Sequence, residues 1–177
     1  MNVVDVLKRI GAVQTGEFIL SSGRKSRVYV DLRKLPSHPR AFKEITRAVA
    51  RLASRLDFDF ICGIAVGGLP LATVVAYEME KKLIYVRKER KGHGTGKIIE
   101  GDFEPGARVL VLDDVATTGS SILRAVRVLR SVGLIVEESL VVVDRLEGAR
   151  EALREAGVKL YSLITLKDLL EGCENGV

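Results

Sequence analysis

Two adjacent acidic residues, followed by a turn rich in hydroxyl groups and glycine, are the part of this sequence best suited to chemistry. Asp113 and Asp114 end an apolar run that begins at Val109, and residues 117–121 read Thr-Thr-Gly-Ser-Ser before a helical pattern starts. Such a run predicts a buried parallel strand, and open α/β sheets bind ligands at the carboxyl ends of their strands. We therefore expect the turn to bind a phosphate through backbone N–H groups and hydroxyls, and the carboxylates to bind the hydroxyls of an attached ribose.

The same stretch resembles the phosphoribosyl pyrophosphate (PRPP) motif of type I phosphoribosyltransferases. The alternative, from the residues alone, is an ordinary strand-to-helix turn in which Asp113 or Asp114 caps the helix. A single acid before a helix favours that alternative, whereas a buried strand, two adjacent acids and the turn in order favour the sugar-phosphate site. Two other nucleotide sites are excluded, because the chain has no G-x-x-x-x-G-K-[ST] sequence and its glycines at 92, 94 and 96 lie in a polar stretch that opens no helix.

A second glycine-rich turn follows the apolar run Phe60–Val66. Gly67 and Gly68 come directly before a helical pattern, and glycine lets a backbone adopt positive φ and approach a ligand closely. The turn is therefore a candidate binding site for pyrophosphate. Paired glycines at such a junction are as often no more than a tight turn, so this prediction depends on the neighbouring sugar-phosphate site.

The third candidate is a cationic segment with almost no apolar residues. Seven basic residues and one acidic residue lie between Lys81 and Lys97, and His93 is flanked by glycines. Glycosyl transfer from PRPP releases pyrophosphate through an oxocarbenium-like transition state, so negative charge grows on the leaving group. Lysine and arginine side chains on a loop over residues 88–97 would neutralise that charge and exclude water, and His93 could donate a hydrogen bond to pyrophosphate. A solvated run of charges is the alternative.

Arg145 is a further candidate ligand-binding residue. It follows the apolar run Leu140–Val143 and Asp144, so it should lie at the carboxyl end of a strand, on the ligand edge of the sheet. A guanidinium group suits a planar carboxylate. From the residues alone, a surface ion pair with Asp144 or Glu147 is an equally good interpretation.

Four segments, in the same order, resemble the orotate phosphoribosyltransferase family. They are residues 17–26 (EFILSSGRKS) for its N-terminal hood, 87–93 (R-K-x-x-K-x-H) for its catalytic loop, 111–119 (VLDDVATTG) for its PRPP motif, and 143–147 with 163–170 for its C-terminal part. The resemblance covers about residues 14–170. The hood and loop segments are more specific to this family than the PRPP motif, which many phosphoribosyltransferases share.

The resemblance implies Mg²⁺-dependent transfer of the 5-phosphoribosyl group from PRPP to orotate, forming orotidine 5′-monophosphate and pyrophosphate in the synthesis of the pyrimidine nucleotide UMP. The residues that it assigns to catalysis are Arg87, Lys88, Lys91, His93, Asp113 and Asp114. PRPP would be bound by these six together with Gly67, Gly68, Val115, Ala116, Thr117, Thr118, Gly119, Ser120 and Ser121. Orotate would be bound by Ser22, Gly23, Thr117 and Arg145.

The resemblance also implies how the active form is assembled. It implies a homodimer in which part of the catalytic loop reaches the partner's active site. Mg²⁺ would be held mainly by PRPP itself, without a dedicated set of protein ligands.

Three positions depart from the pattern of this family. Ser21 stands where many members have a lysine, Gly67 where some bacterial members have a lysine, and Arg27 where a proline often follows the hood serine. These departures argue against a single hood lysine as a catalytic requirement, and they leave the catalytic loop and the PRPP motif intact. Arg24, Lys25 or Arg27 could supply the missing charge, and the sequence does not distinguish among them.

The composition and charge agree with a small anionic substrate. The 177 residues carry a net charge of +5, and 47% of them are apolar, enough for one domain with a real core. The basic excess is concentrated in the 81–97 segment and has no interleaved aromatic residues to stack on bases, so we expect no nucleic-acid partner. Two alternatives stay open: a phosphoribosyltransferase for another base, which the PRPP motif permits, and a PRPP-sensing regulator that binds nucleic acid, which only the net charge favours.

No segment predicts export or membrane insertion. The N-terminus reads as an amphipathic helix without the apolar region of a signal peptide, and no apolar stretch approaches the length of a membrane span. Cys62 lies in an apolar run, which predicts a small core residue, and neither Cys62 nor Cys173 belongs to a C-x-x-C pair. We therefore expect a cytoplasmic protein with no membrane partner.

Alternating strands and helices must bring these residues to one edge. The pattern predicts the type I phosphoribosyltransferase fold, a parallel sheet flanked by helices, as a single domain over residues 1–177 with a hood at 1–35 and an α/β core at 36–177. Predicted strands are 17–20, 27–31, 60–66, 83–86, 98–102, 108–113, 139–143 and 160–164. Predicted helices are 3–10, 39–55, one from the 67–70 turn to 80, one through 122–129, 148–156 and 165–170.

Overall fold

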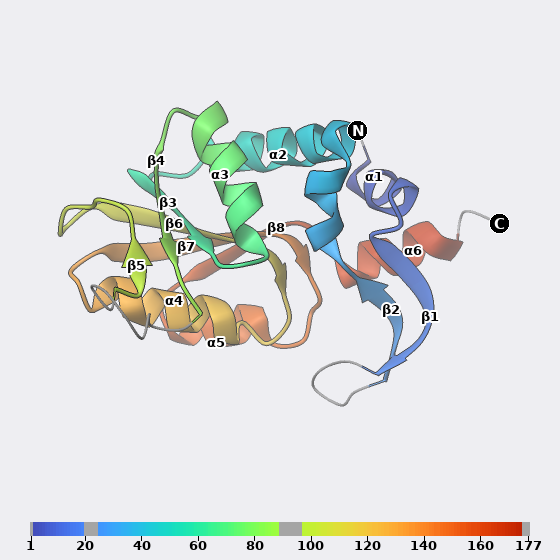
Figure 1. Cartoon of the computed structure of the whole chain (residues 1–177). Helices are drawn as coiled ribbons and strands as arrows, with labels where there is room; N and C mark the ends of the chain where they lie inside the picture. Colours follow the sequence, from blue (N-terminus) through green and yellow to red (C-terminus); the bar gives the residue numbers. More distant parts are fainter. Residues whose placement is uncertain (1, 20–24, 89–96, 175–177) are drawn as a thin grey trace.

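The computed structural model describes residues 2–19, 25–88 and 97–174, and the chain folds around a six-stranded sheet (Figure 1). The helices are α1 (Val3–Arg9), η1 (Leu32–Ser37, a 3₁₀ helix), α2 (Pro39–Ala53), α3 (Gly68–Glu78), α4 (Ser120–Arg130), α5 (Ala149–Glu155) and α6 (Leu166–Glu174). The strands are β1 (Val13–Ile19), β2 (Lys25–Val30), β3 (Phe60–Ile64), β4 (Lys82–Val86), β5 (Ile99–Glu100), β6 (Arg108–Ala116), β7 (Ile135–Asp144) and β8 (Lys159–Thr165).

The large sheet has the strand order β5-β4-β3-β6-β7-β8. Strands β4, β3, β6, β7 and β8 are parallel, and β5 pairs antiparallel with β4 at the edge. The predicted parallel sheet is therefore confirmed for five strands. The sheet as a whole is mixed, because β5 returns directly along β4, and a direct return between neighbouring strands makes them antiparallel.

Helices cover both faces of this sheet (Figure 1). Alternate residues of the central strands point to opposite faces, so Leu110 and Leu112 pack with α2 and α3, whereas Val109 and Val111 pack with α4 and α5. Both sets are buried, which is why the sequence of β6 reads as a continuous apolar run. Cys62 is a fully buried core residue, as predicted, and burial raises the pKa of its thiol to about 12.

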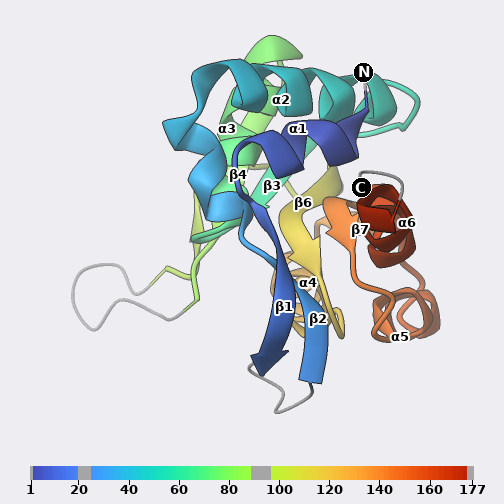
Figure 2. The ribbon, with the colours of Figure 1, turned by 90° about the vertical axis from the view of Figure 1, so that its right-hand side faces the viewer.

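The hairpin of β1 and β2 forms a separate antiparallel sheet. Figure 2 shows this hairpin running down from α1, across the end of the large sheet. Helix α1, in contrast, packs into the same buried layer as α2 and α6 through Val4, Val6 and Leu7. Within the first 35 residues it is therefore the hairpin that stands apart, and the predicted boundary between hood and core stays a prediction.

Several strand bounds differ from the predicted ones. The strand β6 continues to Ala116 instead of ending at Asp113, β1 starts at Val13 instead of Glu17, β7 starts at Ile135 instead of Ser139, β3 ends at Ile64 instead of Val66, and η1 was not predicted. The added strand ends contain polar residues, and pairing with a neighbouring strand holds them in place, as β7 does for residues 113–116 of β6. Apolar runs cannot mark such ends.

Helix α2 is the longest helix among the described residues, with 15 residues. Pro39 occupies its first turn, where a proline needs no N–H partner, as predicted. Within the ranges that the structure describes, none of the helices combines the length and the apolar character that spanning a membrane requires.

Candidate active site

The carboxyl end of β6 lies against the turn that enters α3. The strand β6 runs on past the end of β3, so Asp113 and Asp114 face Gly67 and Gly68. A Cβ at Gly67 would lie 2.6 Å from Asp114 Oδ2, and a Cβ at Gly68 would lie 2.7 Å from Asp113 Oδ1. No ordinary Cβ approaches another atom so closely. The acid pair and the glycine pair that the sequence singled out therefore meet at one edge of the sheet.

The two acids are withdrawn from water. Asp113 is only 7% exposed, its Oδ1 accepts the N–H of Asp114 at 3.0 Å, and Asp114 Oδ1 accepts the N–H of Val115 at 2.8 Å. Burial, and then the neighbouring Asp114 charge, raises the pKa of Asp113 well above its ordinary value. Burial also raises the pKa of Asp114. Hydroxyl donors on a ligand would replace the lost water, so the pair is suited to a sugar.

The Thr117–Ser121 turn leads directly into α4, and neither acid caps that helix. The N-cap is Gly119, which has φ of 80° and lies so close to Ala149 that a Cβ would be 3.2 Å from the Ala149 Cα. The alternative in which Asp113 or Asp114 caps the helix is therefore wrong. The turn and the start of α4 line a small hollow together with residues 113, 115 and 116. Exposed hydroxyls and uncapped N–H groups at a helix start suit a phosphate.

Arg87 and Lys88 lie just past the end of β4, the strand next to β3. The guanidinium of Arg87 pairs with Glu100 of β5, with Nη1 3.2 Å from Oε1. The guanidinium of Arg124, on α4, donates to the carbonyl oxygens of both Arg87 and Lys88, each at 2.6 Å. Two of the predicted cations are thus at the same side of the molecule as the start of α4, and contacts with β5 and α4 hold them.

Arg145 is buried instead of lying open on the ligand edge. It is 5% exposed, its Nε donates to Glu147 Oε1 at 2.8 Å, and its Nη2 lies 3.5 Å from the carbonyl oxygen of Val28 on β2. Asp144 pairs with Arg150 instead, since its Oδ2 accepts a hydrogen bond from Arg150 Nε at 2.6 Å. Of the two partners that the sequence left open, Glu147 is the one that pairs with Arg145. The guanidinium therefore lies where the hairpin meets the end of β7.

Four predicted site residues lie outside the described residues: Ser22, Gly23, Lys91 and His93. Two of the candidate replacements for the hood lysine, Lys25 and Arg27, lie on β2 and are exposed, whereas Arg24 is not described. The roles of all these residues stay predictions.

Two arginines of this region were missed by the sequence analysis. Arg124 occupies a polar position in the helical pattern of α4. From the sequence alone, an arginine there cannot be distinguished from one that simply faces solvent. Arg33 lies in η1 and pairs with Asp31 at 2.8 Å, and its positive charge opposes the effect of burial on the pKa of Asp114. A pocket of about 140 Å³ between η1 and α3 is lined by Leu32, Arg33, Leu35, Pro36, Phe42, Val66, Gly67, Pro70, Leu71 and Asp114. No pattern predicted η1, so nothing in the sequence indicated that Arg33 would approach the acids.

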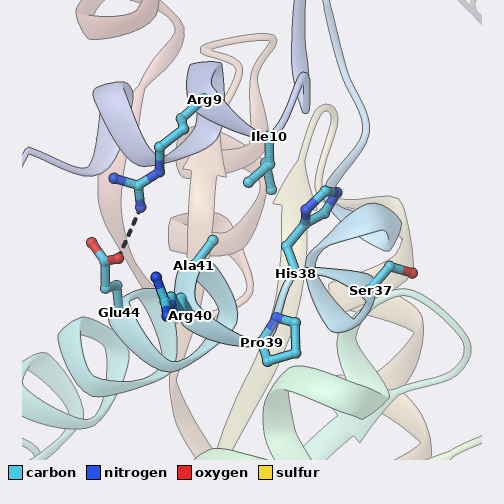
Figure 3. A pocket seen from close by; sticks show the side chains of 8 residues that line it. All are labelled: Arg9, Ile10, Ser37, His38, Pro39, Arg40, Ala41 and Glu44. Carbon is cyan, nitrogen blue, oxygen red and sulfur yellow. Dashed lines mark hydrogen bonds and ion pairs between the residues drawn. The ribbon is translucent and has the colours of Figure 1, made fainter.

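A larger hollow, of about 740 Å³, lies away from these residues (Figure 3). It is lined by Arg9, Ile10, Ser37, His38, Pro39, Arg40, Ala41 and Glu44, where α1 meets the start of α2. Figure 3 shows Arg9 and Glu44 paired at one side of it. The distance from Arg9 Nη2 to Glu44 Oε1 is 2.8 Å. None of the predicted site residues that the structure describes lines this hollow, so the chemistry of the side chains, and not the size of the hollow, locates the candidate site.

The donor set at this edge fits a metal ion only in part. Among the described residues, no three or more His, Cys, Asp or Glu side chains are grouped to hold a metal ion. Mg²⁺ requires about six oxygen ligands and usually takes several from water and substrate phosphates. The carboxylates of Asp113 and Asp114 can supply part of that ligand set, so they fit a Mg²⁺ ion whose other ligands come from water and from a polyphosphate.

Known proteins resemble this chain along nearly its whole length. Residues 34–160 match the family described as phosphoribosyl transferase domain. Orotate phosphoribosyltransferase of Pyrococcus abyssi is 43% identical over 163 residues, which cover 91% of this chain and 90% of that protein. The crystal structure of orotate phosphoribosyltransferase from Aeropyrum pernix has a TM-score of 0.91 at 46% identity and covers 99% of this chain and 100% of that chain. The Mycobacterium tuberculosis enzyme of the same name, solved in complex with PRPP, has a TM-score of 0.77 at 34% identity and covers 94% of this chain and 96% of that chain.

Proposed function

This chain belongs to the phosphoribosyl transferase family, and from that membership we propose that it transfers the 5-phosphoribosyl group of PRPP to orotate, yielding orotidine 5′-monophosphate and pyrophosphate. The chain has the type I phosphoribosyltransferase fold. The observation that carries the proposal is the meeting of the acid pair, the phosphate-type turn and the glycine pair at one edge of the sheet. The Pyrococcus abyssi and Aeropyrum pernix relatives, which match this chain along nearly its whole length, are orotate phosphoribosyltransferases.

The acid pair and the turn after it would bind the ribose 5-phosphate part of PRPP. Asp113 and Asp114 would accept hydrogen bonds from the ribose hydroxyls, since ionised carboxylates are acceptors only. The 5′-phosphate would lie at the start of α4, on the N–H groups and hydroxyls of Thr117–Ser121, where the helix dipole favours negative charge. Val115 and Ala116 belong to the hollow beside that phosphate.

The pyrophosphate of PRPP would lie between the glycine pair and the cations after β4. Because Gly67 and Gly68 have no side chains, their turn approaches the acids closely, which would bring the pyrophosphate next to the ribose site. As the bond between the ribose C1′ and the pyrophosphate oxygen breaks, the cations of Arg87 and Lys88 would stabilise the negative charge on the leaving group. Because residues 87–93 resemble the catalytic loop of the family, Lys91 and His93 would also stabilise the negative charge on the pyrophosphate.

Orotate would bind where the hairpin meets the core. Arg145 carries five N–H donors in a fork that matches a planar carboxylate, and its Nε already binds Glu147. Nη2 donates a long hydrogen bond of 3.5 Å to the Val28 carbonyl oxygen on β2, and it would exchange this contact for the carboxylate of orotate. Glu147 would orient the fork and balance its charge. Thr117, Ser22 and Gly23 would complete the site for the base.

Three finer assignments belong to the same proposal. Mg²⁺ would be required and would neutralise charge on the pyrophosphate, bound mainly through PRPP, as the donor set of Asp113 and Asp114 suggests. The active form would be a homodimer with shared active sites, because residues 87–93 resemble the family's catalytic loop, which reaches the partner's active site. The protein would act in the cytoplasm.

The test is orotate consumption, followed by ultraviolet absorbance, with purified protein, PRPP and Mg²⁺. We expect loss of orotate absorbance only when both PRPP and Mg²⁺ are present, and no effect of added adenine or hypoxanthine. An Asp114→Asn variant is the matched control, since it keeps the size of the side chain and removes one ribose acceptor. A protein that binds PRPP and leaves orotate unchanged would refute the proposed base specificity.

A further inference from the structure

The side chain of Arg124 bridges two distant parts of the chain. Its Nη1 donates to the carbonyl oxygen of Lys88 and its Nη2 to the carbonyl oxygen of Arg87, both at 2.6 Å. The acceptors are consecutive carbonyls, and they lie 36 and 37 residues away along the sequence. A guanidinium donates from two nitrogens in a fixed plane, so one side chain sets the orientation of two successive peptide groups.

The backbone at Arg87 is held from other sides as well. Its N–H donates to the carbonyl oxygen of Ile98 at 2.9 Å, and its guanidinium pairs with Glu100 at 3.2 Å. Both of these contacts come from β5 and the residue before it. Arg124 supplies the contact from α4, and among the described residues it is the side chain that donates a hydrogen bond to the Lys88 carbonyl oxygen. The direction in which the Lys88 side chain leaves the backbone therefore depends on Arg124.

Helix geometry connects the same arginine to the phosphate turn. Arg124 comes four residues after Ser120, the first residue of α4, and residues i and i+4 share one face of a helix. The first turn of α4 and the end of β4 are thus joined through a single rigid helical turn. No residue of α4 is acidic, and among the described residues the Arg124 guanidinium has carbonyl partners and no carboxylate partner. Within the described part of the chain, its placement therefore serves the two carbonyl oxygens and not an ion pair.

We infer that Arg124 is a positioning residue of the phosphoribosyl transfer, and this rests on the proposed function. It holds the peptide groups of Arg87 and Lys88 so that their side chains are presented to the pyrophosphate of PRPP. It also ties them to the helix whose first residues bind the 5′-phosphate. Arg124 acts through the backbone of those two residues and does not itself need to touch the substrate.

The test compares Arg124→Gln with Arg127→Gln. Arg127 lies on the same helix, is exposed, and its side chain has no hydrogen bond or ion pair with the residues that the structure describes, so its loss removes the same charge without the bridge. We expect Arg124→Gln to lower kcat roughly 10- to 100-fold, because small displacements of charge-stabilising groups cost about that much. The KM for orotate should stay within about twofold, since Arg124 does not face the base. Arg127→Gln should change neither constant.

Two further readouts separate positioning from a structural role. The carbonyls that Arg124 binds are near the surface and can be solvated, so Tm should fall by no more than about 2 °C in either variant. Arg124→Lys should recover only part of kcat, because an ammonium group cannot reproduce the planar fork. A kcat within twofold of the unmodified protein for Arg124→Gln would overturn the inference. So would a loss of kcat matched by an equal rise in the KM for orotate.

Failure of the proposed function would show itself separately. If the unmodified protein does not consume orotate, the base assignment fails, and calorimetry with inorganic pyrophosphate then tests Arg124 alone. Arg124→Gln should bind pyrophosphate at least about fivefold more weakly than the unmodified protein, and Arg127→Gln should bind it equally well. Equal pyrophosphate affinity in all three proteins would refute the positioning role whatever the base is.

Discussion

Gly67 lies so close to Asp114 that a Cβ on the glycine would be 2.6 Å from Oδ2 and 2.9 Å from Cγ of the acid. The atoms that it would meet belong to the end of a side chain. At Gly68 the neighbours include backbone, with the Asp113 Cα and the Leu112 carbonyl oxygen both 2.8 Å from a Cβ. The lysine that some bacterial orotate phosphoribosyltransferases carry at position 67 would therefore have to displace Asp114 in this chain. The absence of a side chain at Gly67 therefore leaves room for the Asp114 carboxylate. Its absence at Gly68 allows the turn to pack against the backbone of β6.

Gly67→Ala should therefore weaken PRPP binding and leave the fold nearly unchanged. The Asp114 carboxylate can rotate away from the new methyl group, and it then no longer meets the ribose hydroxyls. We expect PRPP to bind roughly tenfold more weakly, which is about the effect of one lost hydrogen bond to a charged group. Calorimetry with PRPP and Mg²⁺ measures this. An unchanged affinity would mean that Asp114 does not bind PRPP.

Gly68→Ala, the matched variant, should destabilise the fold. A methyl group there meets backbone that cannot rotate away, and such overpacking costs about 1–3 kcal/mol. For a chain of this length the Tm should fall by about 2–4 °C for each kcal/mol. Thermal unfolding of both alanine variants side by side measures the difference. A Gly68→Ala protein as stable as the Gly67→Ala protein would contradict the close approach to Leu112 and Asp113.

Asp114→Asn should stabilise the protein at neutral pH while it weakens PRPP binding. The substitution removes one of two neighbouring buried charges, and the amide can donate a hydrogen bond to Asp113. Relief of such functional strain is commonly worth about 0.5–2 kcal/mol. Tm and PRPP affinity should therefore move in opposite senses, with affinity lower by roughly tenfold or more. A lower Tm for Asp114→Asn would indicate that the charges of Asp113 and Asp114 do not repel each other significantly in the folded protein.

The stabilising effect of Asp114→Asn should depend on pH. The pKa values of Asp113 and Asp114 are raised in the folded protein, so these groups contribute stability that is fully present below the ordinary carboxyl value of 3.8 and is lost as pH rises through the raised values. The Tm difference between the variant and the unmodified protein should be largest near about pH 8 and should shrink toward about pH 4. Unfolding curves over that range check this. A difference that does not change with pH would rule out charge repulsion as its cause.

Glu100→Gln should strengthen pyrophosphate binding. Glu100 pairs with Arg87 at 3.2 Å in a partly exposed contact, so it competes with a ligand for the same guanidinium. Such a pair contributes little to stability, about 0–1 kcal/mol, so Tm should hardly change. The KM for pyrophosphate in the reverse reaction should fall roughly two- to fivefold. Glu104→Gln removes an exposed partner of Lys82 and is the control, for which we expect no change.

Glu147→Gln should raise the KM for orotate. The side chains of Arg145 and Glu147 are 5% and 12% exposed, and the carboxylate of Glu147 holds Arg145 Nε at 2.8 Å. Without that charge the guanidinium fork loses its orientation and its balance, and we expect a KM roughly tenfold higher with PRPP affinity unchanged. Glu151→Gln, an exposed acid of α5, is the control. An unchanged KM for orotate would separate Arg145 from recognition of the base.

The sequence by itself determined the parts of the site that are contiguous along the chain. Residues 109–112 form a strand buried on both faces, so an apolar run is sufficient to predict it. The acids and the Thr117–Ser121 turn follow this strand directly, so residues that are neighbours along the chain are also neighbours in the site. The start of α2 at Pro39 was predictable for the same reason, because a first-turn proline acts locally.

Only the tertiary structure decided which polar side chains meet. Glu147 rather than Asp144 pairs with Arg145, Arg150 takes Asp144, and Arg124 reaches two carbonyls that are 36 and 37 residues away. The pattern of apolar residues predicts burial and local geometry, because both depend mainly on residues that are close together in the sequence. The partner of a charged group depends on which strands lie side by side and how far each one extends. The approach of Gly67 to Asp114 has the same origin, since it exists because β6 extends beyond the end of β3.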